Sequence, residues 1–447
     1  MVFLLYKNKI RYGVNKMKKN IIKPSILAGF MELLPKEQEI FNDIVDKITD
    51  VYKNNGCMSV DTPIIEKAEV LLAKGGGETE KQVYSFQKGK NNLALRFDLT
   101  VPFARYVAQY YNDLIFPFKR YQLGKVYRGE RNQKGRYREF YQCDVDVIGK
   151  DKLSINNDAW VISLADKAFR NIGVANYEFQ ISNRKILKGI LSELDIENAT
   201  DVMILIDKYD KIGQKCFEKE LVNIIGNEKS KYLNRIFNIQ GTNEIILDEL
   251  LKLDIKNDYF LEGINELSQV KSMLEILDVD SKQFRINLKI IRGLDYYTGT
   301  VFETILVGNQ NYGSICSGGR YDNLAENYTD NLLPGVGISI GITRLFFVLK
   351  EIGFIENYKI KDALDYLIIP IGDTMNYCVK VMKCLEENGY GVTVYFEDNS
   401  LKKKMQYANK LGVENVILIG EEEMIKNEVK IKNMWSGEDK NIDYKLL

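Results

Sequence analysis

The stretch VYRGERNQKGRYREFYQCDVDVIG, residues 126–149, decides how the central part of this chain folds. It contains five cationic side chains and four carboxylates, and residues suited to a hydrophobic core gather near its end. Residues 122–128 and 138–147 alternate as strands do, and the polar, glycine-containing segment 132–135 between them is typical of a turn. We therefore predict an antiparallel hairpin.

The faces of this hairpin indicate its chemistry, because side chains two residues apart on a strand point the same way. On the second strand, one face carries Arg138, Phe140, Gln142, Asp144 and Asp146. Arg128 and Glu130 share a face of the first segment. Arginines suit phosphates, an aromatic ring suits stacking, and acids suit a cationic group, so this face suits a nucleotide triphosphate beside an amino acid. A solvated hairpin laced with ion pairs is the alternative that the pattern leaves open.

Length and composition describe an ordinary globular protein. The chain has 447 residues, which predicts two or three domains. No apolar run is long enough for a bilayer, and the N-terminus does not resemble a secretory signal, so we expect a cytoplasmic protein without a membrane partner. The six cysteines lack metal-binding spacing, and we expect free thiols.

The sequence contains no histidine. Its absence excludes Ser-His-Asp and Cys-His catalytic arrangements and every imidazole metal ligand. Whatever chemistry the chain performs must use arginine, carboxylates, amides, phenols or a metal ion that arrives with a substrate.

Patterns along the chain predict an α+β protein in several parts. Residues 1–22 form a basic, Asn-rich leader, and residues 23–355 mix strands and helices in the main domain. Within it, residues 193–277 are rich in Leu, Ile, Lys and Glu at helical spacing, which predicts a helical insertion. Residues 362–447 read as β-α-β-α-β, which predicts a small parallel-sheet domain. Residues 91–111 predict a strand that runs into a helix.

The hairpin closely resembles the second signature motif of the histidyl-tRNA synthetases, a class II aminoacyl-tRNA synthetase family. Other motifs follow in the family's order: NGCMSVDTPII (55–65), LRFDLTVPFARY (95–106), IRGLDYYTGTVFE (291–303), GSICSGGRYDNL (313–324) and GVGISIGITRLFFVL (335–349). The resemblance extends from about residue 24 to the C-terminus. It implies an antiparallel sheet flanked by helices, with class-defining motifs near 55–65, 120–149 and 334–349, and a C-terminal α/β anticodon-binding domain.

The resemblance implies an ATP site made by the hairpin and the third motif. Arg128 and Arg344 correspond to the paired arginines that hold the α- and γ-phosphates, with Arg136 at the β/γ end. Phe140 would stack under the adenine, and Glu130 would accept a hydrogen bond from its exocyclic amine. A rigid guanidinium fork suits such phosphate contacts.

Arg292 corresponds to the family's catalytic arginine at the α-phosphate, where charge builds up as the carboxylate of the amino acid attacks. A carboxylate is already a nucleophile at neutral pH, so no general base is needed. Mg²⁺ would be held largely by phosphates and water, and we assign no protein ligand to it.

The resemblance also implies a pocket for L-histidine. Positions that hold the ammonium and carboxylate groups correspond to Asp98, Leu99, Thr100 and Gln142, and Arg292 belongs to the same pocket. Positions around the imidazole correspond to Asp146, Tyr296, Tyr297 and Tyr321. Hydrogen bonds to both ring nitrogens would reject other amino acids steeply. Each of these residues could instead belong to the hydrophobic core.

The implied partners are tRNA-His and a second copy of the chain. Gln133 corresponds to a position near the acceptor end of the tRNA. Lys402, Lys403 and Lys404 could contact RNA phosphates or simply be solvated. Segment 55–65 resembles the first motif, which builds a two-fold interface, so we expect a homodimer.

These features favour a histidine–tRNA ligase over one competing function. A non-catalytic regulatory subunit of ATP phosphoribosyltransferase would share the fold, but such proteins typically lose motif arginines and the C-terminal domain. Arg128, Arg292 and Arg344 are all present here. The lack of histidine would allow synthesis when charged tRNA-His is scarce, or it reflects composition alone.

Overall fold

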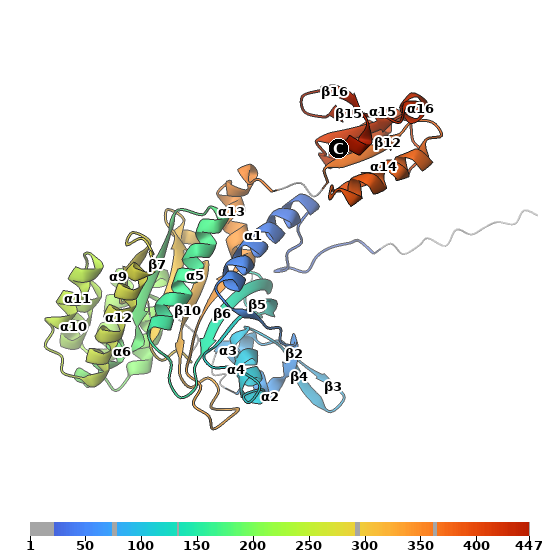
Figure 1. The fold of residues 1–447 in the computed structure, drawn as a ribbon. Coiled ribbons are helices and arrows are strands. Elements are labelled where there is room, and N and C mark those ends of the chain that lie inside the picture. The colour runs from blue at the N-terminus through green and yellow to red at the C-terminus, as the bar shows by residue number, and fades with distance from the viewer. Residues whose placement is uncertain (1–21, 74–77, 132–133, 291–295, 361–363, 447) are drawn as a thin grey trace, which may run out of the picture. The chain divides into compact units, whose positions relative to one another are not determined.

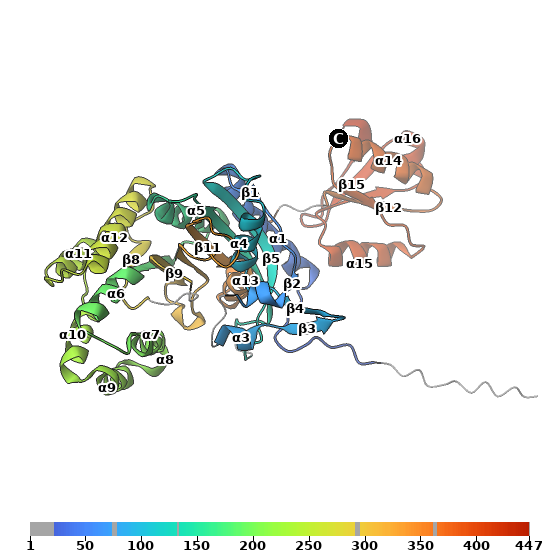
Figure 2. The same ribbon diagram turned by 90° about the horizontal axis from the view of Figure 1, so that it is seen from below.

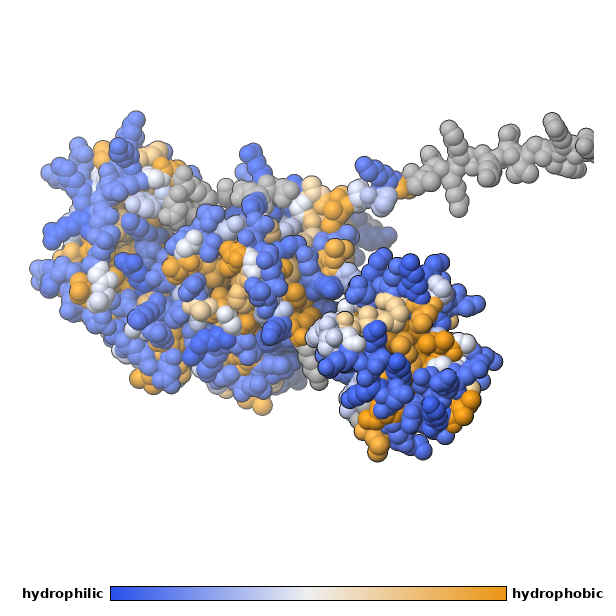
Figure 3. Space-filling view, turned by 90° about the horizontal axis from the view of Figure 1, so that it is seen from above, coloured by the Kyte–Doolittle hydropathy of each residue, from blue (hydrophilic) through white to orange (hydrophobic). Residues whose placement is uncertain are grey.

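The computed structural model describes residues 22–73, 78–131, 134–290, 296–360 and 364–446. The chain forms two compact units, residues 1–357 and 358–447, which Figure 1 shows as ribbons. Hydrophilic residues cover much of the face seen in Figure 3, with apolar patches between them. Across these ranges, no helix is both long and apolar enough to cross a membrane.

An eight-stranded sheet forms the centre of the first unit. In spatial order its strands are β1 (Met58–Ser59), β5 (Phe118–Tyr127), β6 (Glu139–Ile148), β11 (Gly335–Gly341), β10 (Cys316–Tyr321), β9 (Thr300–Leu306), β7 (Tyr177–Asn183) and β8 (Phe284–Ile286). The outermost pairs, β1 with β5 and β7 with β8, are parallel, and all the pairs between them are antiparallel. The expected fold class is therefore confirmed.

The predicted hairpin is strands β5 and β6. Their register runs from Tyr127 opposite Glu139 to Phe118 opposite Ile148, so the antiparallel prediction is confirmed. The first strand begins at Phe118 rather than at residue 122. Its earlier residues include Arg120, which is fully buried although it is charged. Because a pattern of alternating hydrophobicity counts arginine as an exposed residue, it did not extend the strand this far.

Helices cover one face of this sheet. They are α1 (Pro35–Asn54), α5 (Asn156–Ile172) and α13 (Ile342–Glu351). On α1, Ile44, Ile48 and Tyr52 recur every four residues and are completely buried, which is the stripe of an amphipathic helix. Cys143 and Val145 of β6 supply buried side chains on the covered face. The alternate residues of β6 therefore point to the opposite face.

A smaller part of the first unit lies beside β5. It contains a three-stranded sheet and three helices: β2 (Ile65–Lys67), α2 (Ala68–Leu71), α3 (Glu78–Gln82), β3 (Ser85–Lys88), β4 (Asn91–Leu95) and α4 (Thr100–Gln109). Strand β4 leads into α4, which confirms the strand and helix predicted for residues 91–111. Asp98 lies between them, and its Oδ1 accepts a hydrogen bond from the Val101 N–H at 3.0 Å. This bond satisfies one of the free amides at the start of α4.

The segment 193–277 is helical in the structure. After α6 (Arg184–Glu193) come α7 (Ala199–Asp207), α8 (Tyr209–Ile212), α9 (Gln214–Ile225), α10 (Asn227–Phe237), α11 (Asn243–Leu251) and α12 (Asp258–Ile276). Figures 1 and 2 show these helices beyond the β7 and β8 edge of the large sheet. Gly189 of α6 and Gly263 of α12 allow the two helices to pack closely, because a Cβ atom at either would meet the other's backbone at 2.5 and 2.7 Å.

The second unit confirms one expectation and extends it. It contains β12 (Tyr366–Pro370), α14 (Met375–Glu387), β13 (Val392–Val394), α15 (Leu401–Leu411), β14 (Asn415–Ile419), α16 (Glu421–Lys426), β15 (Val429–Asn433) and β16 (Asp439–Ile442). Strands β13, β12 and β14 are parallel as predicted, but β15 and β16 continue the sheet antiparallel. The parallel pairing predicted for the first three strands is therefore confirmed, whereas the antiparallel extension by β15 and β16 was not predicted. Antiparallel pairing needs no long crossover, and the short α16 does not supply one.

Lys404 also differs from expectation. Its side chain is buried, and Nζ donates a hydrogen bond to the Pro370 carbonyl oxygen at 2.9 Å. Lys402 and Lys403 on the same helix are exposed. Residues one or two apart on a helix point in different directions, so Lys404 contributes to the packing of the second unit and not to a surface for RNA.

Because Lys404 is buried while Lys402 and Lys403 are exposed, substitutions at these positions should affect stability differently. Lys404→Ala leaves a buried carbonyl without its donor, so we expect it to lower the free energy of unfolding by about 1–3 kcal/mol. Lys402→Ala and Lys403→Ala serve as controls and should leave the melting temperature unchanged. Thermal unfolding of the full chain measures all three, and equal melting temperatures would contradict the structural role of Lys404.

Candidate active site

A cavity of about 320 Å³ opens on the face of the large sheet opposite α1 and α5. Such a volume is typical of a small-molecule site. Its lining comprises Asp98, Thr100, Arg128, Glu130, Gly135, Arg136, Tyr137, Phe140, Gln142, Asp144, Tyr296, Tyr297, Glu303, Gly313, Ser314, Ile315, Cys316, Ser317, Ser339, Gly341 and Arg344. The structure thus brings together ten residues that the sequence singled out from segments far apart in the chain.

Strand register makes the floor of this cavity. Gln142 of β6 lies opposite Gly341 of β11, and Asp144 lies opposite Ser339. Partners in register share a face, so one polar row crosses several strands. Gln142 Nε2 donates a hydrogen bond to Ser339 Oγ at 2.9 Å. The side-chain oxygen of Gln142 is buried and finds no partner among the described residues, which leaves it available to a ligand donor.

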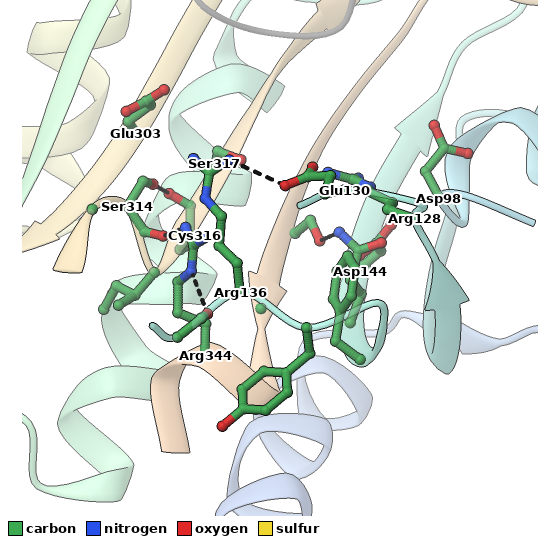
Figure 4. Close-up of a pocket in the computed structure, with 18 of the residues that line it drawn as sticks. Asp98, Arg128, Glu130, Arg136, Asp144, Glu303, Ser314, Cys316, Ser317 and Arg344 are labelled. Carbon is green, nitrogen blue, oxygen red and sulfur yellow. Dashed lines mark hydrogen bonds and ion pairs between the residues drawn. The ribbon is translucent and has the colours of Figure 1, made fainter. Parts of the chain in front are cut away.

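Arg344 stands at one end of the cavity. Its Nε donates a hydrogen bond to the Gly135 carbonyl oxygen at 3.2 Å, and its Nη1 donates one to the Ser314 carbonyl oxygen at 2.9 Å. These two bonds hold the guanidinium group in place. Burial and the neighbouring Arg136 lower the pKa of Arg344 to about 10. Figure 4 shows these two arginines close together, with Asp98 on the other side of the pocket. Crowded cations are stabilised by a polyanion, so this end suits phosphate.

The hairpin contributes the other groups expected for a nucleotide. Arg128 Nε donates to the Phe97 carbonyl at 3.0 Å, and its guanidinium lies 5.3 Å from the centre of the Phe140 ring. Arg136 Nη1 lies 3.1 Å from Glu130 Oε2. These side chains all face the cavity, in the arrangement that phosphate contacts and base stacking require.

An acidic group marks a second end of the cavity. Asp98 is only 2% exposed, and Tyr296 OH donates to its Oδ2 at 3.4 Å. Burial raises the pKa of Asp98 to about 6, although the Val101 amide and Arg128 oppose the shift. A buried carboxylate of this kind is stabilised by a ligand cation, so this end suits an ammonium group. Thr100 lines the same end.

Three tyrosines pack next to this acidic end. The ring centres of Tyr296 and Tyr297 are 5.0 Å apart at 71°, and those of Tyr296 and Tyr321 are 6.0 Å apart at 84°. Such edge-to-face packing holds the rings rigidly. Tyr296 and Tyr297 line the cavity, whereas Tyr321 does not.

Asp146, expected beside the imidazole, does not belong to the lining of the cavity. Its Oδ1 accepts a hydrogen bond from Tyr321 OH at 2.8 Å, and its Oδ2 lies 2.7 Å from Nη2 of the buried Arg120. A Cβ atom at Gly337 would lie 1.9 Å from Asp146 Oδ1, so glycine is required there. Leu99 is also fully buried and presents its carbonyl oxygen to Arg120 Nη2 at 3.2 Å.

Two expected residues lie outside the described ranges, namely Arg292 and Gln133. Several lining residues have no role implied by the motifs: Asp144, Glu303, Ser314, Ser317 and Ser339. Alternation had placed Asp144 on the correct face. Glu303, Ser317 and Ser339 lie on β9, β10 and β11, and Ser314 lies just before β10. All four belong to segments that the motifs include, but the motifs do not show that these side chains face the cavity.

Comparison with known proteins agrees with this geometry. The family model described as histidyl-tRNA synthetase matches residues 29–345, and the one described as an anticodon binding domain matches residues 365–446. A histidine–tRNA ligase of Clostridium acetobutylicum is 62% identical over 424 residues, which are 95% of this chain and 99% of that protein. The crystal structure of a histidyl-tRNA synthetase from Nostoc sp. PCC 7120 is 36% identical, with a TM-score of 0.86, covering 95% of this chain and 98% of that one.

A structure from Bacillus halodurans bears on the competing function. It is described as an ATP phosphoribosyltransferase regulatory subunit/histidyl-tRNA synthetase, and it is 20% identical with a TM-score of 0.75, covering 89% of this chain and 99% of that one. That likeness shows the fold alone. The family match and the 62% identity are far more specific. The chain therefore belongs to the histidyl-tRNA synthetase family.

Proposed function

We propose that this protein is a histidine–tRNA ligase, which uses ATP to activate L-histidine and then transfers the histidyl group to tRNA-His. The high identity to a curated ligase over nearly the whole chain favours this function over the regulatory subunit. We place the reaction in the cytoplasm, where histidine, ATP and tRNA meet.

One structural observation carries the proposal at the level of the site. A single cavity joins Arg128, Arg136 and Arg344 to a second end that holds Asp98 and Gln142. Phosphates need the first group and an ammonium group needs the second. The amino acid's carboxylate would then lie between them, next to the α-phosphate.

This placement sets up the activation step. A carboxylate oxygen of histidine attacks the α-phosphorus of ATP, and the bond from that phosphorus to the bridging oxygen breaks, so pyrophosphate leaves with the electron pair. Arg128 would stabilise the α-phosphate charge, while Arg344 and Arg136 would hold the departing phosphates. Positioning and fixed positive charge supply the rate, and no proton has to move.

We assign Arg292 to the same α-phosphate on the resemblance of its motif, although it lies outside the described residues. Mg²⁺ would supply further charge neutralisation on the phosphates. The described residues contain no group of three or more acidic or thiol side chains placed to hold a metal ion, and we expect phosphate oxygens and water to hold most of its coordination sphere.

In the transfer step, a hydroxyl of the terminal tRNA ribose attacks the histidyl carbonyl carbon, and AMP leaves. We propose that Gln133 lies near the acceptor end and that the second unit binds the anticodon. Lys402 and Lys403, which are exposed, remain candidates for phosphate contacts there.

We also propose a homodimer. Met58, Ile64 and Ile65 in or next to the first motif are 49%, 42% and 48% exposed, which is unusual for a cluster of large apolar side chains in a single chain. We expect the double variant Ile64→Lys/Ile65→Lys to be monomeric, because buried lysines oppose association. Sedimentation measures the mass. Ile276→Lys, at a 70% exposed position of α12, is the control and should remain dimeric.

The activity itself is tested by pyrophosphate–ATP exchange. The wild-type protein should exchange label only when histidine is added, and it should charge tRNA-His. If dimeric, folded protein binds histidine but catalyses no exchange, the regulatory function is favoured instead.

A further inference from the structure

Arg96 is a buried arginine outside the cavity, and the resemblance implies no role for it. It directly follows β4, two residues before Asp98, and it is only 3% exposed. It does not belong to the lining of the cavity. A buried charge is costly unless partners satisfy it, so the partners of Arg96 show which parts of the fold it holds together.

The side chain of Arg96 joins the end of β4 to two other segments. Its Nε donates a hydrogen bond to the Lys125 carbonyl oxygen of β5 at 2.9 Å. Its Nη1 donates a hydrogen bond to the carbonyl oxygen of the buried Thr62 and lies 3.4 Å from Asp61 Oδ1. Asp61 and Thr62 belong to the first motif, between β1 and β2. One guanidinium group therefore ties β4, β5 and the first motif together.

The contacts with β5 complete one edge of that strand. Among the described strands, β6 pairs along the whole length of β5, whereas β1 pairs with it at only two residues near its start. Further along, the Tyr127 N–H donates to the Arg96 carbonyl oxygen at 2.9 Å. A neighbouring parallel strand would also donate a backbone N–H to the Lys125 carbonyl. Here the backbone N–H of Arg96 donates to Ile64 instead, and its side-chain Nε supplies the donor for Lys125.

This edge of β5 leads directly to Arg128, the first residue after the strand. The next residue after Arg96 holds the Arg128 side chain, because Arg128 Nε donates to the Phe97 carbonyl oxygen at 3.0 Å. Asp98 is held differently, by an amide at the start of α4 and by a tyrosine hydroxyl. Loss of the Arg96 side chain should therefore disturb the direction of Arg128 more than the ammonium end of the cavity.

We propose that Arg96 is a positioning residue for the activation step: its side chain completes the edge of β5 and so fixes the direction in which Arg128 presents its guanidinium group. The proposal rests on the proposed function, which places Arg128 at the α-phosphate of ATP. A misplacement of about 1 Å can cost on the order of a hundredfold in rate. An arginine outside the cavity can thus control the rate of the reaction within it.

The first test separates positioning from binding. Arg96→Met keeps a long side chain without donors, and it should lower kcat of histidine-dependent pyrophosphate–ATP exchange by about tenfold or more. KM for ATP and for histidine should each stay within about threefold, because a contact made in the transition state affects kcat and kcat/KM equally. Arg96→Lys keeps the charge but lacks Nε, so it should also be slow. A wild-type kcat in either variant would contradict the proposal.

A double-mutant cycle tests whether Arg96 acts through Arg128. Arg128→Ala removes the group that Arg96 is proposed to orient. In that background, Arg96→Met should lower the residual exchange rate by less than about twofold. A residue that only stabilises the fold would reduce the rate by the same factor in both backgrounds, and equal factors would exclude a positioning role.

Arg105→Met is the matched control. Arg105 of α4 lies in the same smaller part of the first unit, and its side chain contacts Glu66 of β2 at 2.5 Å and Gln109 of α4 at 3.1 Å. Neither partner belongs to β5. Arg96→Met and Arg105→Met should both lower the melting temperature, since each leaves buried groups without a donor, but Arg105→Met should keep the wild-type kcat. A comparable loss of kcat in Arg105→Met would mean that general loosening explains the effect, and the proposal would be wrong.

Gly124→Ala tests the same contact without removing a donor. Gly124 lies on β5, and a Cβ atom there would overlap Arg96 Nη2, so this substitution must displace the guanidinium group. We expect kcat to fall about tenfold, with no further loss when Gly124→Ala and Arg96→Met are combined. An unchanged kcat in Gly124→Ala would show that the position of the Arg96 side chain does not matter. A wild-type protein without histidine-dependent exchange would instead overturn the proposed function.

Discussion

Arg344→Ala should reduce histidine-dependent pyrophosphate–ATP exchange by about 10²–10³-fold, the loss typical of removing one preorganised group that stabilises transition-state charge. The effect should be large because two backbone carbonyls hold this guanidinium in place before ATP arrives. Most of the loss should appear in kcat together with a higher KM for ATP, whereas KM for histidine should change little. Steady-state exchange kinetics at varied ATP and histidine separate these effects.

Two further variants make this test specific. Arg344→Lys keeps the charge but not the planar fork, so it should recover only part of the lost rate. Lys350→Ala removes a cation from the same helix, where Lys350 forms an exposed ion pair with Glu37, and it should leave exchange unchanged. Exchange by Arg344→Ala within threefold of wild type would remove Arg344 from the phosphate site.

Asp98→Asn should lower kcat/KM for histidine by about 10²–10³-fold at pH 8, because an ammonium group would lose its buried counter-charge. Asn keeps the size of the side chain and can still accept the Val101 N–H bond that Asp98 makes now. We therefore expect the fold to survive, and the near-wild-type circular dichroism of the variant would show this. KM for ATP should remain close to the wild-type value.

The pH dependence of this variant tests the charge directly. Because burial raises the pKa of Asp98 to about 6, the free enzyme carries the carboxylate above that pH and the neutral acid below it. The ratio of wild-type to variant kcat/KM should therefore shrink by about tenfold from pH 8 to pH 5. The imidazole of the substrate titrates equally in both measurements, so it cancels in the ratio. A ratio that stays constant would mean that Asp98 does not meet the ammonium group as a carboxylate.

Local patterns predicted much of the architecture. The β5 and β6 hairpin and the strand that precedes α4 follow from alternation and turn chemistry within about twenty residues. The direction of β15 could not be predicted in this way. This strand pairs antiparallel with β14, and local patterns do not show which edge of the sheet is still open to it. Lys404 was misjudged for a related reason: helical spacing alone did not show that its side chain lies over the end of β12.

The residues of the site likewise divide into those that the sequence predicted and those that only the structure revealed. Motif resemblance named Arg128, Arg344, Asp98 and Gln142, and all four line one cavity. It could not name Ser317, Ser339 or Glu303, which reach the cavity only because β9, β10 and β11 pair beside the hairpin.

The sequence by itself determined the family, the side-chain chemistry of the pocket and the face of β6 on which its acids lie. It did so because strand alternation and motif order are local properties of the chain. Only the tertiary structure decided which acid meets the cavity. Asp144 and Asp146 share one face and one residue type, but Asp146 lies against Arg120 and Tyr321, from two other strands, and only Asp144 lines the cavity.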